Sequence, residues 1–227
     1  MDYVIAAAPR PSLPVVGTQA RFPVHRIYCV GRNYLAHVRE LGYDEKTPPF
    51  FFSKASDMIV EDGVAIPYPP LTNNFHHEVE LVVAIGKGGV NIPVESALDC
   101  VYGYAVGFDM TRRDAQQAAA KQGHPWEIGK SFDYSAPCGS VHPAAQVGHL
   151  REGEIQLSVN GQVRQRSDLS LMIWDAPHIL NQLSQQVSLE PGDLIYTGTP
   201  EGVSPVVSGD TIVGRIARLG SLTIKIA

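Results

Sequence analysis

The segment His76-His-Glu-Val-Glu-Leu-Val-Val-Ala-Ile85 indicates both a buried strand of the fold and the position of the candidate site. Its apolar, largely β-branched residues run into a glycine-rich turn, a pattern typical of a β-strand. Side chains repeat every second residue along a strand, so Glu78 and Glu80 share one face, about 7 Å apart along the backbone. The segment therefore predicts two carboxylates in one neighbourhood of a mostly apolar strand.

A third acid, Asp109, follows another predicted strand at residues 101–108. Burying several like charges is costly unless something neutralises them, and a divalent cation would do so. Three carboxylates without cysteine or paired histidine form an oxygen site that favours Mg²⁺ or Mn²⁺ over Zn²⁺. The alternative is that Glu78 and Glu80 lie on the solvated face of an edge strand, which is the commoner fate of such a pair.

The composition indicates the class of fold. Charged residues make up only 18% of the 227 residues, and the 21 glycines and 17 prolines favour many short strands over long helices. We expect a mainly β protein, with residues 1–20, which prolines interrupt, as an N-terminal extension and residues 21–227 as a single domain. The net charge of −5 excludes a basic surface for nucleic acid or a polybasic membrane patch.

The cysteines and the apolar segments bear on the compartment. Cys29, Cys100 and Cys138 are odd in number, widely spaced and without a metal-ligand pattern, which favours reduced, buried thiols in an intracellular protein. The apolar run at residues 4–8 is too short for a signal peptide, and no segment approaches the ~20 apolar residues of a membrane span. We expect a cytoplasmic protein without a membrane partner.

A histidine and a glutamate define a candidate general base. Residues 32–42 have helical character and end at a glycine, so His37 and Glu40 share a helix face at i and i+3. The carboxylate can then orient the imidazole and hold its basic tautomer. If this face is turned away from a substrate, the pair is only an exposed amphipathic turn.

Further polar residues follow Asp109. Thr111 is a candidate N-cap for a helix over residues 112–121, and Gly123 ends it. On that helix Arg113 and Gln116 could reach the cavity of the three acids, or could be solvated.

Two lysines and a loop complete the candidate site. Lys54 ends an apolar strand at residues 50–54 and is either a strand-end lysine in water or part of the cavity. Lys130 lies on an apolar, glycine-containing segment, so it either snorkels outward or is held against carboxylates. After a strand near residue 195, the free backbone amides of a glycine-rich loop and the Thr199 hydroxyl could receive a carboxylate.

Other local patterns concern only the fold. Asn160-Gly161 predicts a type I′ hairpin within residues 153–166. Asp175 is predicted to cap a helix over residues 176–187. The glycine-rich residues 86–89 are most simply a hairpin turn.

Six motifs in the same order resemble the fumarylacetoacetate hydrolase family over nearly the whole chain. They are Cys29-Val-Gly-Arg-Asn-Tyr with His37 and Glu40, Phe-Ser-Lys54, His-Glu78-Val-Glu80, Phe-Asp109-Met-Thr-Arg-Arg113-Asp, Lys130-Ser-Phe-Asp, and Asp-Leu-Ile-Tyr-Thr-Gly-Thr199-Pro-Glu-Gly. The resemblance implies an α+β, mainly β fold, a mixed β-roll of the C-terminal-domain type of that family with short peripheral helices. It also implies a homodimer.

The resemblance also implies roles for the site residues. Glu78, Glu80 and Asp109 would hold Mg²⁺ or Mn²⁺, His37 and Glu40 would activate a water, and Lys130 would stabilise the developing oxyanion or position the water. Substrate-binding residues would be Arg32, Lys54, Arg113, Gln116 and Thr199.

The activity implied is hydrolysis of a carbon–carbon bond in a ketonic substrate. The substrate class is a 2,4-dioxo acid, with fumarylpyruvate favoured, giving fumarate and pyruvate in aromatic catabolism. An oxaloacetate decarboxylase or a general acylpyruvase is the alternative, because loss of CO₂ from oxaloacetate gives the same pyruvate enolate. A non-catalytic keto-acid-binding protein is a second alternative, and the sequence fixes neither the acyl group nor the metal.

Overall fold

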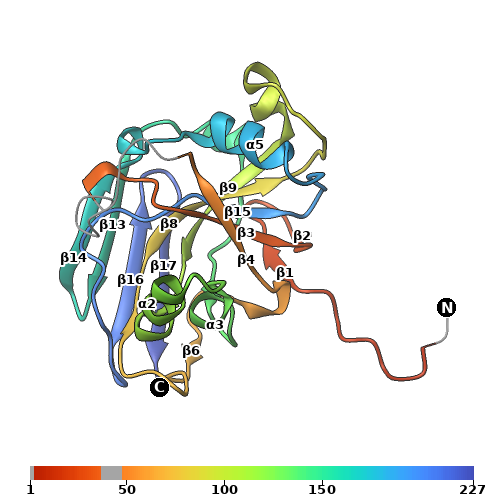
Figure 1. Cartoon of the computed structure of the whole chain (residues 1–227). Helices are drawn as coiled ribbons and strands as arrows, with labels where there is room; N and C mark the ends of the chain where they lie inside the picture. Colours follow the sequence, from red (N-terminus) through yellow and green to blue (C-terminus); the bar gives the residue numbers. More distant parts are fainter. Residues whose placement is uncertain (1–2, 37–47) are drawn as a thin grey trace.

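The computed structural model describes residues 3–36 and 48–227, so the predicted His37 and Glu40 pair lies outside the described residues. Two larger sheets make up most of the fold (Figure 1). The six-stranded sheet contains, in spatial order, β12 (His142–Pro143), β9 (Val101–Phe108), β8 (Val79–Ile85), β15 (Leu194–Tyr196), β3 (Ile27–Gly31) and β4 (Phe50–Lys54). The five-stranded sheet contains β14 (Gln162–Asp168), β13 (Glu154–Val159), β16 (Thr211–Ile216), β17 (Gly220–Ile226) and β6 (Ala65–Ile66).

Short strand pairs and helices surround these sheets. The pairs are β1 (Ser12–Pro14) with β2 (Arg21–Pro23), β7 (Phe75–His76) with β10 (Thr111–Arg112), and β5 (Ile59–Val60) with β11 (Ala136–Pro137). The helices are α2 (Arg113–Gln122), α3 (Glu127–Lys130), α4 (Ala144–Val147) and α5 (Ala176–Ser184), with 3₁₀ turns η1 (Ser56–Met58), η2 (Val94–Cys100) and η3 (Leu169–Leu171). The mainly β, mixed-sheet fold with short peripheral helices is thereby confirmed. Among the described residues, no helix has the length and apolarity that a membrane span requires.

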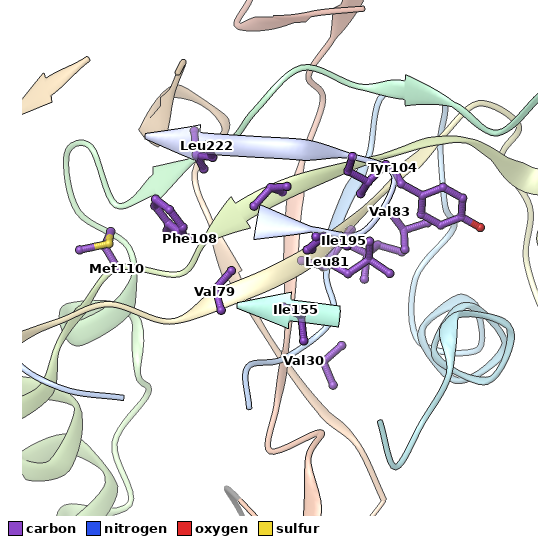
Figure 2. Close-up of a cluster of buried hydrophobic side chains, with 14 of the residues drawn as sticks. Val30, Val79, Leu81, Val83, Tyr104, Phe108, Met110, Ile155, Ile195 and Leu222 are labelled. Atoms are coloured by element: carbon purple, nitrogen blue, oxygen red, sulfur yellow. The ribbon is translucent and has the colours of Figure 1, made fainter. Parts of the chain in front are cut away.

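Strand β8 is central, and all seven of its residues are buried. It pairs antiparallel with β9 on one side and with β15 on the other. Its odd-numbered residues, Val79, Leu81 and Val83, belong to the core that includes Ile155 and Leu222 of the five-stranded sheet (Figure 2). Its even-numbered Val82 and Ala84 face a second core. Because side chains alternate, Glu78 and Glu80 lie on the face of that second core.

The two sheets approach closely at one glycine. A Cβ on Gly214 of β16 would overlap the ring of Phe108 and contact Val79. A side chain there would push the sheets apart, so this position requires glycine. The close packing holds the ends of β8 and β9, where the three acids lie, in a fixed position.

Most local predictions agree with the structure. Asn160 and Gly161 have φ of 51° and 80°, as a type I′ turn requires, and the Asp175 carboxylate accepts from the amide of His178. Gly123 ends α2 with a left-handed φ of 67°. Helix α5 ends at Ser184, three residues before the predicted end.

Two predictions are wrong. Thr111 is not an N-cap, because it pairs with His76 in a two-residue strand and its hydroxyl donates to the carbonyl of Asp109. Residues 86–89 do not form a tight hairpin turn. They begin a longer connection in which the amides of Gly86 and Lys87 both donate to the carbonyl of Cys100. The domain boundary near residue 20 stays a prediction.

Candidate active site

The three predicted acids converge in the interior. One carboxylate oxygen from each of Glu78, Glu80 and Asp109 lies within 4.8 Å of the other two, and the residues are 5%, 1% and 1% exposed. The ladder between β8 and β9 creates this proximity, because Val79 pairs with Phe108 and the amide of Asp109 donates to the carbonyl of Glu78 at 2.9 Å. The alternative of a solvated edge strand is therefore wrong.

Both lysines of the predicted site are buried among these acids. Lys130 Nζ, from the last residue of α3, donates to Glu78 Oε2 at 2.8 Å, Asp109 Oδ2 at 2.6 Å and Thr111 Oγ1 at 2.7 Å. Burial by itself lowers the pKa of Lys130, but the negative charges of Asp109 and Glu78 outweigh burial. The pKa is therefore raised above its usual value, and the ammonium stays charged. Its three N–H groups are thus all used within the protein.

Lys54 supports the same carboxylate from β4. Its Nζ lies 2.8 Å from Asp109 Oδ1 and donates to the backbone carbonyls of Met110 and Lys130. The approach to Asp109 Oδ1 lacks hydrogen-bond geometry, so this buried oxygen has no hydrogen-bond donor among the described residues. Asp109 Oδ1 therefore lies close to the positive charge of Lys54 and still has lone pairs that accept no hydrogen bond from the described residues.

Helix α2 supplies the third cation. Arg113, at its first residue, donates to Glu78 Oε1 and to Gln116 Oε1, the latter at 2.5 Å. Arg113 and Gln116 therefore both reach the cavity, as one of the two sequence alternatives held. Arg113 binds a carboxylate of the protein itself, which fixes the Glu78 side chain.

Glu80 differs from the other two acids. It accepts one hydrogen bond, from the amide of Gly198 at 2.7 Å, and makes no ion pair within the described part of the chain. Burial raises the pKa of Glu80 well above its usual range, and Asp109 and Glu78 raise it further. A positive ion beside Glu80 and Asp109 Oδ1 would relieve this cost, and the all-oxygen donor set suits a hard divalent cation.

A pocket opens onto the acids. Its wall consists of the triad, Lys130, Arg113, Gln116 and Thr199, together with Val30, Gly31, Arg32, Phe52 and Trp126. Arg32 has a φ of 64°, and its guanidinium lies 5.3 Å from the ring centre of Phe50 and 5.7 Å from that of Trp126. Four of the five predicted substrate-binding residues line the pocket. The fifth, Lys54, does not line it and forms an ion pair with Asp109.

Residues 26–227 match the family model described as fumarylacetoacetate (FAA) hydrolase C-terminal. The chain belongs to the fumarylacetoacetate hydrolase family. It is 44% identical over 177 residues to a fumarylpyruvate hydrolase of Ralstonia sp, covering 78% of this chain and 92% of that protein. It is 42% identical over 200 residues to the mitochondrial oxaloacetate tautomerase of Homo sapiens, covering 88% and 90%.

A solved structure of this family is similar over the whole chain. It is the crystal structure of fumarylpyruvate hydrolase from Pseudomonas aeruginosa in complex with Mn²⁺ and pyruvate. The identity is 50%, the TM-score is 0.98, and the match covers 100% of this chain and 99% of that one. The predicted β-roll of the C-terminal-domain type is thereby confirmed.

Sequence reasoning missed several residues around the site of this family member. Trp126 and Phe52 line the pocket, and Gln165 of the five-stranded sheet bonds to Thr199. A backbone amide of the glycine-rich loop, that of Gly198, does receive a carboxylate as predicted, but it is the carboxylate of Glu80. His77, next to Glu78, is also buried, and burial lowers its pKa to about 4. Of these residues, only His77 could have been identified from the sequence. It directly precedes a predicted buried acid, and a polar side chain that is buried there needs a hydrogen-bond partner.

Proposed function

We propose that this protein is a divalent-metal-dependent hydrolase that cleaves the carbon–carbon bond of a 2,4-dioxo acid. Fumarylpyruvate is the favoured substrate, and fumarate and pyruvate are the products. The observation that carries the proposal is the buried cluster of Glu78, Glu80 and Asp109 at the base of a pocket in a family member. Support comes from the 44% identical fumarylpyruvate hydrolase and from the 50% identical one that binds Mn²⁺ and pyruvate.

We assign the metal site to the three acids, with Mg²⁺ or Mn²⁺ as the ion. The vacant lone pair of Asp109 Oδ1 and the absence of a cation beside Glu80 among the described residues both fit this assignment. When bound, the ion supplies a Lewis acid that polarises the keto-acid oxygens and stabilises the enolate that leaves. Oxygen donors of this kind discriminate poorly between the two metals.

The charges of the site favour a dianionic substrate. Lys54, Lys130 and Arg113 already match the three carboxylates charge for charge. A bound divalent ion then leaves an excess of positive charge among these groups, which a substrate with two carboxylates offsets. Fumarylpyruvate and oxaloacetate are both dianions, whereas an acylpyruvate with an apolar acyl group is a monoanion.

We assign the roles of His37 and Glu40 from the sequence motif and those of the other residues from these contacts. His37, oriented by Glu40, acts as the base that takes a proton from the attacking water, a role that typically contributes ~10²- to 10⁴-fold. Lys130 holds Glu78 and Asp109 together and keeps a positive charge beside the developing oxyanion. We assign the distal carboxylate of the substrate to Arg32, which lines the pocket beside Trp126, and we place Gln116 and Thr199 nearer the metal.

The second candidate function is oxaloacetate chemistry. The 42% identical human relative is an oxaloacetate tautomerase, and a 41% identical relative of Dictyostelium discoideum is an oxaloacetate decarboxylase. Decarboxylation of oxaloacetate needs the same metal site but no attacking water. His37→Ala therefore separates the two functions, because it should abolish hydrolysis and leave decarboxylation largely intact.

We further propose that the chain acts as a cytoplasmic homodimer in the catabolism of aromatic compounds, with residues 21–227 as its catalytic domain. The similarity to fumarylpyruvate hydrolases supports this setting. Analytical ultracentrifugation tests the assembly.

The direct test of the function is an assay of the purified protein with Mg²⁺ or Mn²⁺. Fumarylpyruvate, acetylpyruvate and oxaloacetate are supplied in turn, and pyruvate and the second product are measured. We expect fumarylpyruvate to have the highest kcat/KM. Higher kcat/KM with oxaloacetate would favour the second candidate, and no turnover of any acid would favour a keto-acid-binding protein.

A further inference from the structure

Gln165 connects the five-stranded sheet to the pocket. It is fully buried on β14, and its side-chain amide makes four hydrogen bonds to residues around the end of β8. Its Oε1 accepts from the amide of Val79 at 3.1 Å and from His77 Nδ1 at 3.0 Å. Its Nε2 donates to Thr199 Oγ1 and to the carbonyl of Pro200, both at 2.8 Å.

Two backbone groups fix the direction of every bond in this network. The amide of Val79 can only donate and the carbonyl of Pro200 can only accept, so the orientation of the Gln165 amide is determined. His77 must then carry a proton on Nδ1, and its Nε2 lies 2.9 Å from the Ser204 hydroxyl. The Nδ1–H of His77 thus holds the Gln165 amide in place.

The same logic determines what Thr199 can offer to the pocket. Its hydroxyl accepts from Gln165 and donates its only proton to the carbonyl of Val79 at 2.8 Å. The hydroxyl therefore has no proton left for a carboxylate, contrary to the sequence expectation for this group. The backbone N–H of Thr199, in contrast, makes no hydrogen bond within the described residues, although the residue is only 3% exposed and lines the pocket.

Gln165 and Thr199 also extend the sheet. Strand β15 ends at Tyr196, and the last backbone pairing beside it joins the amide of Thr197 to the carbonyl of Leu81. One step further along β8, the N–H and C=O of Val79 have no strand partner on this side and bond to Gln165 and Thr199 instead. The network thus fixes the loop after β15 to β8, on the strand that carries Glu80.

We propose that Gln165, held by His77, is a positioning residue that locks Thr199 so that its backbone N–H receives the carboxylate of the bound keto acid. A buried, unpartnered N–H in a pocket wall is a preorganised donor for an anion. This inference rests on the function proposed above only for the identity of the ligand. Gln165 touches neither substrate nor metal, so its effect is on binding rather than on the chemical step.

A double-mutant cycle tests the proposal. We expect Gln165→Met and Thr199→Val each to raise the KM for fumarylpyruvate about tenfold while kcat changes less than about twofold. Both substitutions remove the hydrogen bond between Gln165 and Thr199. The KM of the double variant should therefore be no higher than that of the single variant with the higher KM. Gln162→Met, at an exposed glutamine of the same strand, is the control and should leave both constants unchanged.

Several results would overturn the proposal. One is a double variant whose KM rises by the product of the single effects, and another is a KM unchanged in Gln165→Met. A fall in kcat at constant KM in Thr199→Val would place the hydroxyl at the chemical step instead. If Gln165→Met does not fold, Gln165→Glu carries the test, since it keeps both acceptor contacts and loses both donors, and it should raise KM similarly.

A binding measurement keeps this proposal separate from the proposed function. Calorimetric titration of the Mn²⁺-loaded protein with pyruvate needs no turnover, and we expect affinity about tenfold weaker in Gln165→Met and Thr199→Val. If the unmodified protein binds pyruvate in this way but turns over no dioxo acid, the proposed function fails and the inference stands. Equal pyruvate affinity in all variants, or a His77 without a proton on Nδ1 in ¹⁵N spectra, would contradict the inference.

Discussion

Two buried carboxylates with opposite surroundings lie near the two ends of β15, Asp193 just before the strand and Glu80 of β8 bonded to the loop after it. At the start of the strand, Asp193 is fully buried and saturated with donors. It accepts from His25 Nδ1 at 2.9 Å, from the Arg26 guanidinium at 2.7 and 3.0 Å, and from the amide of Glu190 at 2.9 Å. At the other end, Glu80 has one amide donor and no ion pair among the described residues. The first carboxylate is complete within the chain, and we propose that a metal ion completes the second.

This difference distinguishes a carboxylate that stabilises the fold from one that binds a ligand, without any comparison with related proteins. A buried acid that holds its full set of donors stabilises the fold, and removing it leaves those donors unpaired. A buried acid with vacant lone pairs beside other acids destabilises the fold until a cation binds. The comparison therefore predicts opposite consequences for the two removals.

The largest effect is expected from Glu80→Gln. The amide keeps an acceptor for Gly198 but removes the charge that binds the ion, so we expect kcat to fall by at least about 10³-fold. In the metal-free protein the melting temperature should not fall, because a poorly compensated buried charge is removed. Glu95→Gln, at an exposed glutamate, is the control in assays and thermal melts.

The next effect is expected from Asp193→Asn. We expect the free energy of unfolding to fall by about 2 to 3 kcal/mol, because Arg26 loses a charge-assisted partner and one carboxylate oxygen becomes a donor. The activity of the folded fraction should be unchanged. Urea unfolding measures the first quantity, and a stability equal to that of the unmodified protein would remove the contrast between the two ends of β15.

Metal binding should stabilise only the protein with an intact acid cluster. At a Mn²⁺ concentration 100 times its Kd, the unmodified chain should gain about 2.7 kcal/mol of unfolding free energy. The Asp193→Asn variant should gain the same amount, and Glu80→Gln should gain little. Thermal melts with and without EDTA show this, and equal gains in all three proteins would place the ion elsewhere.

A small effect is expected from a saturated carboxylate at the surface. Asp168 accepts from the hydroxyl and amide of Ser170 and from the amide of Gly153, and these bonds lower its pKa below the ordinary 3.8. A lowered acid pKa stabilises the folded state above pH 3.8, and this stabilisation is lost as the pH falls through the folded-state pKa. Asp168→Asn should therefore lower the melting temperature slightly at pH 7, by an amount that shrinks in acid.

The acid cluster could be predicted from the sequence because it depends on the alternation of side chains within one short strand. Alternation along residues 76–85 places Glu78 and Glu80 on one face, and a neighbouring strand brings Asp109 beside them. The burial of the two lysines could not be predicted in this way. Lys54 and Lys130 each had a solvated alternative, and only the packed structure shows that both are 3% exposed or less.

The hydrogen-bond network behind Thr199 depends on contacts between distant segments. Gln165 lies on β14 of the five-stranded sheet, whereas His77 lies between β7 and β8, 88 residues away in the sequence. No spacing rule within one strand or helix connects them, and a glutamine in a hairpin strand is ordinarily solvated. The misassigned Thr111 cap has a similar cause, because pairing with His76 overrides the local helix signal.

Titration of the metal-free protein with Mn²⁺ by calorimetry tests the central claim most directly. We expect one ion per chain in the unmodified protein, competition by Mg²⁺, and loss of binding in Glu80→Gln but not in Asp193→Asn. Binding that survives in Glu80→Gln, or no binding to the unmodified chain, would contradict the assignment of the buried acids as a metal site.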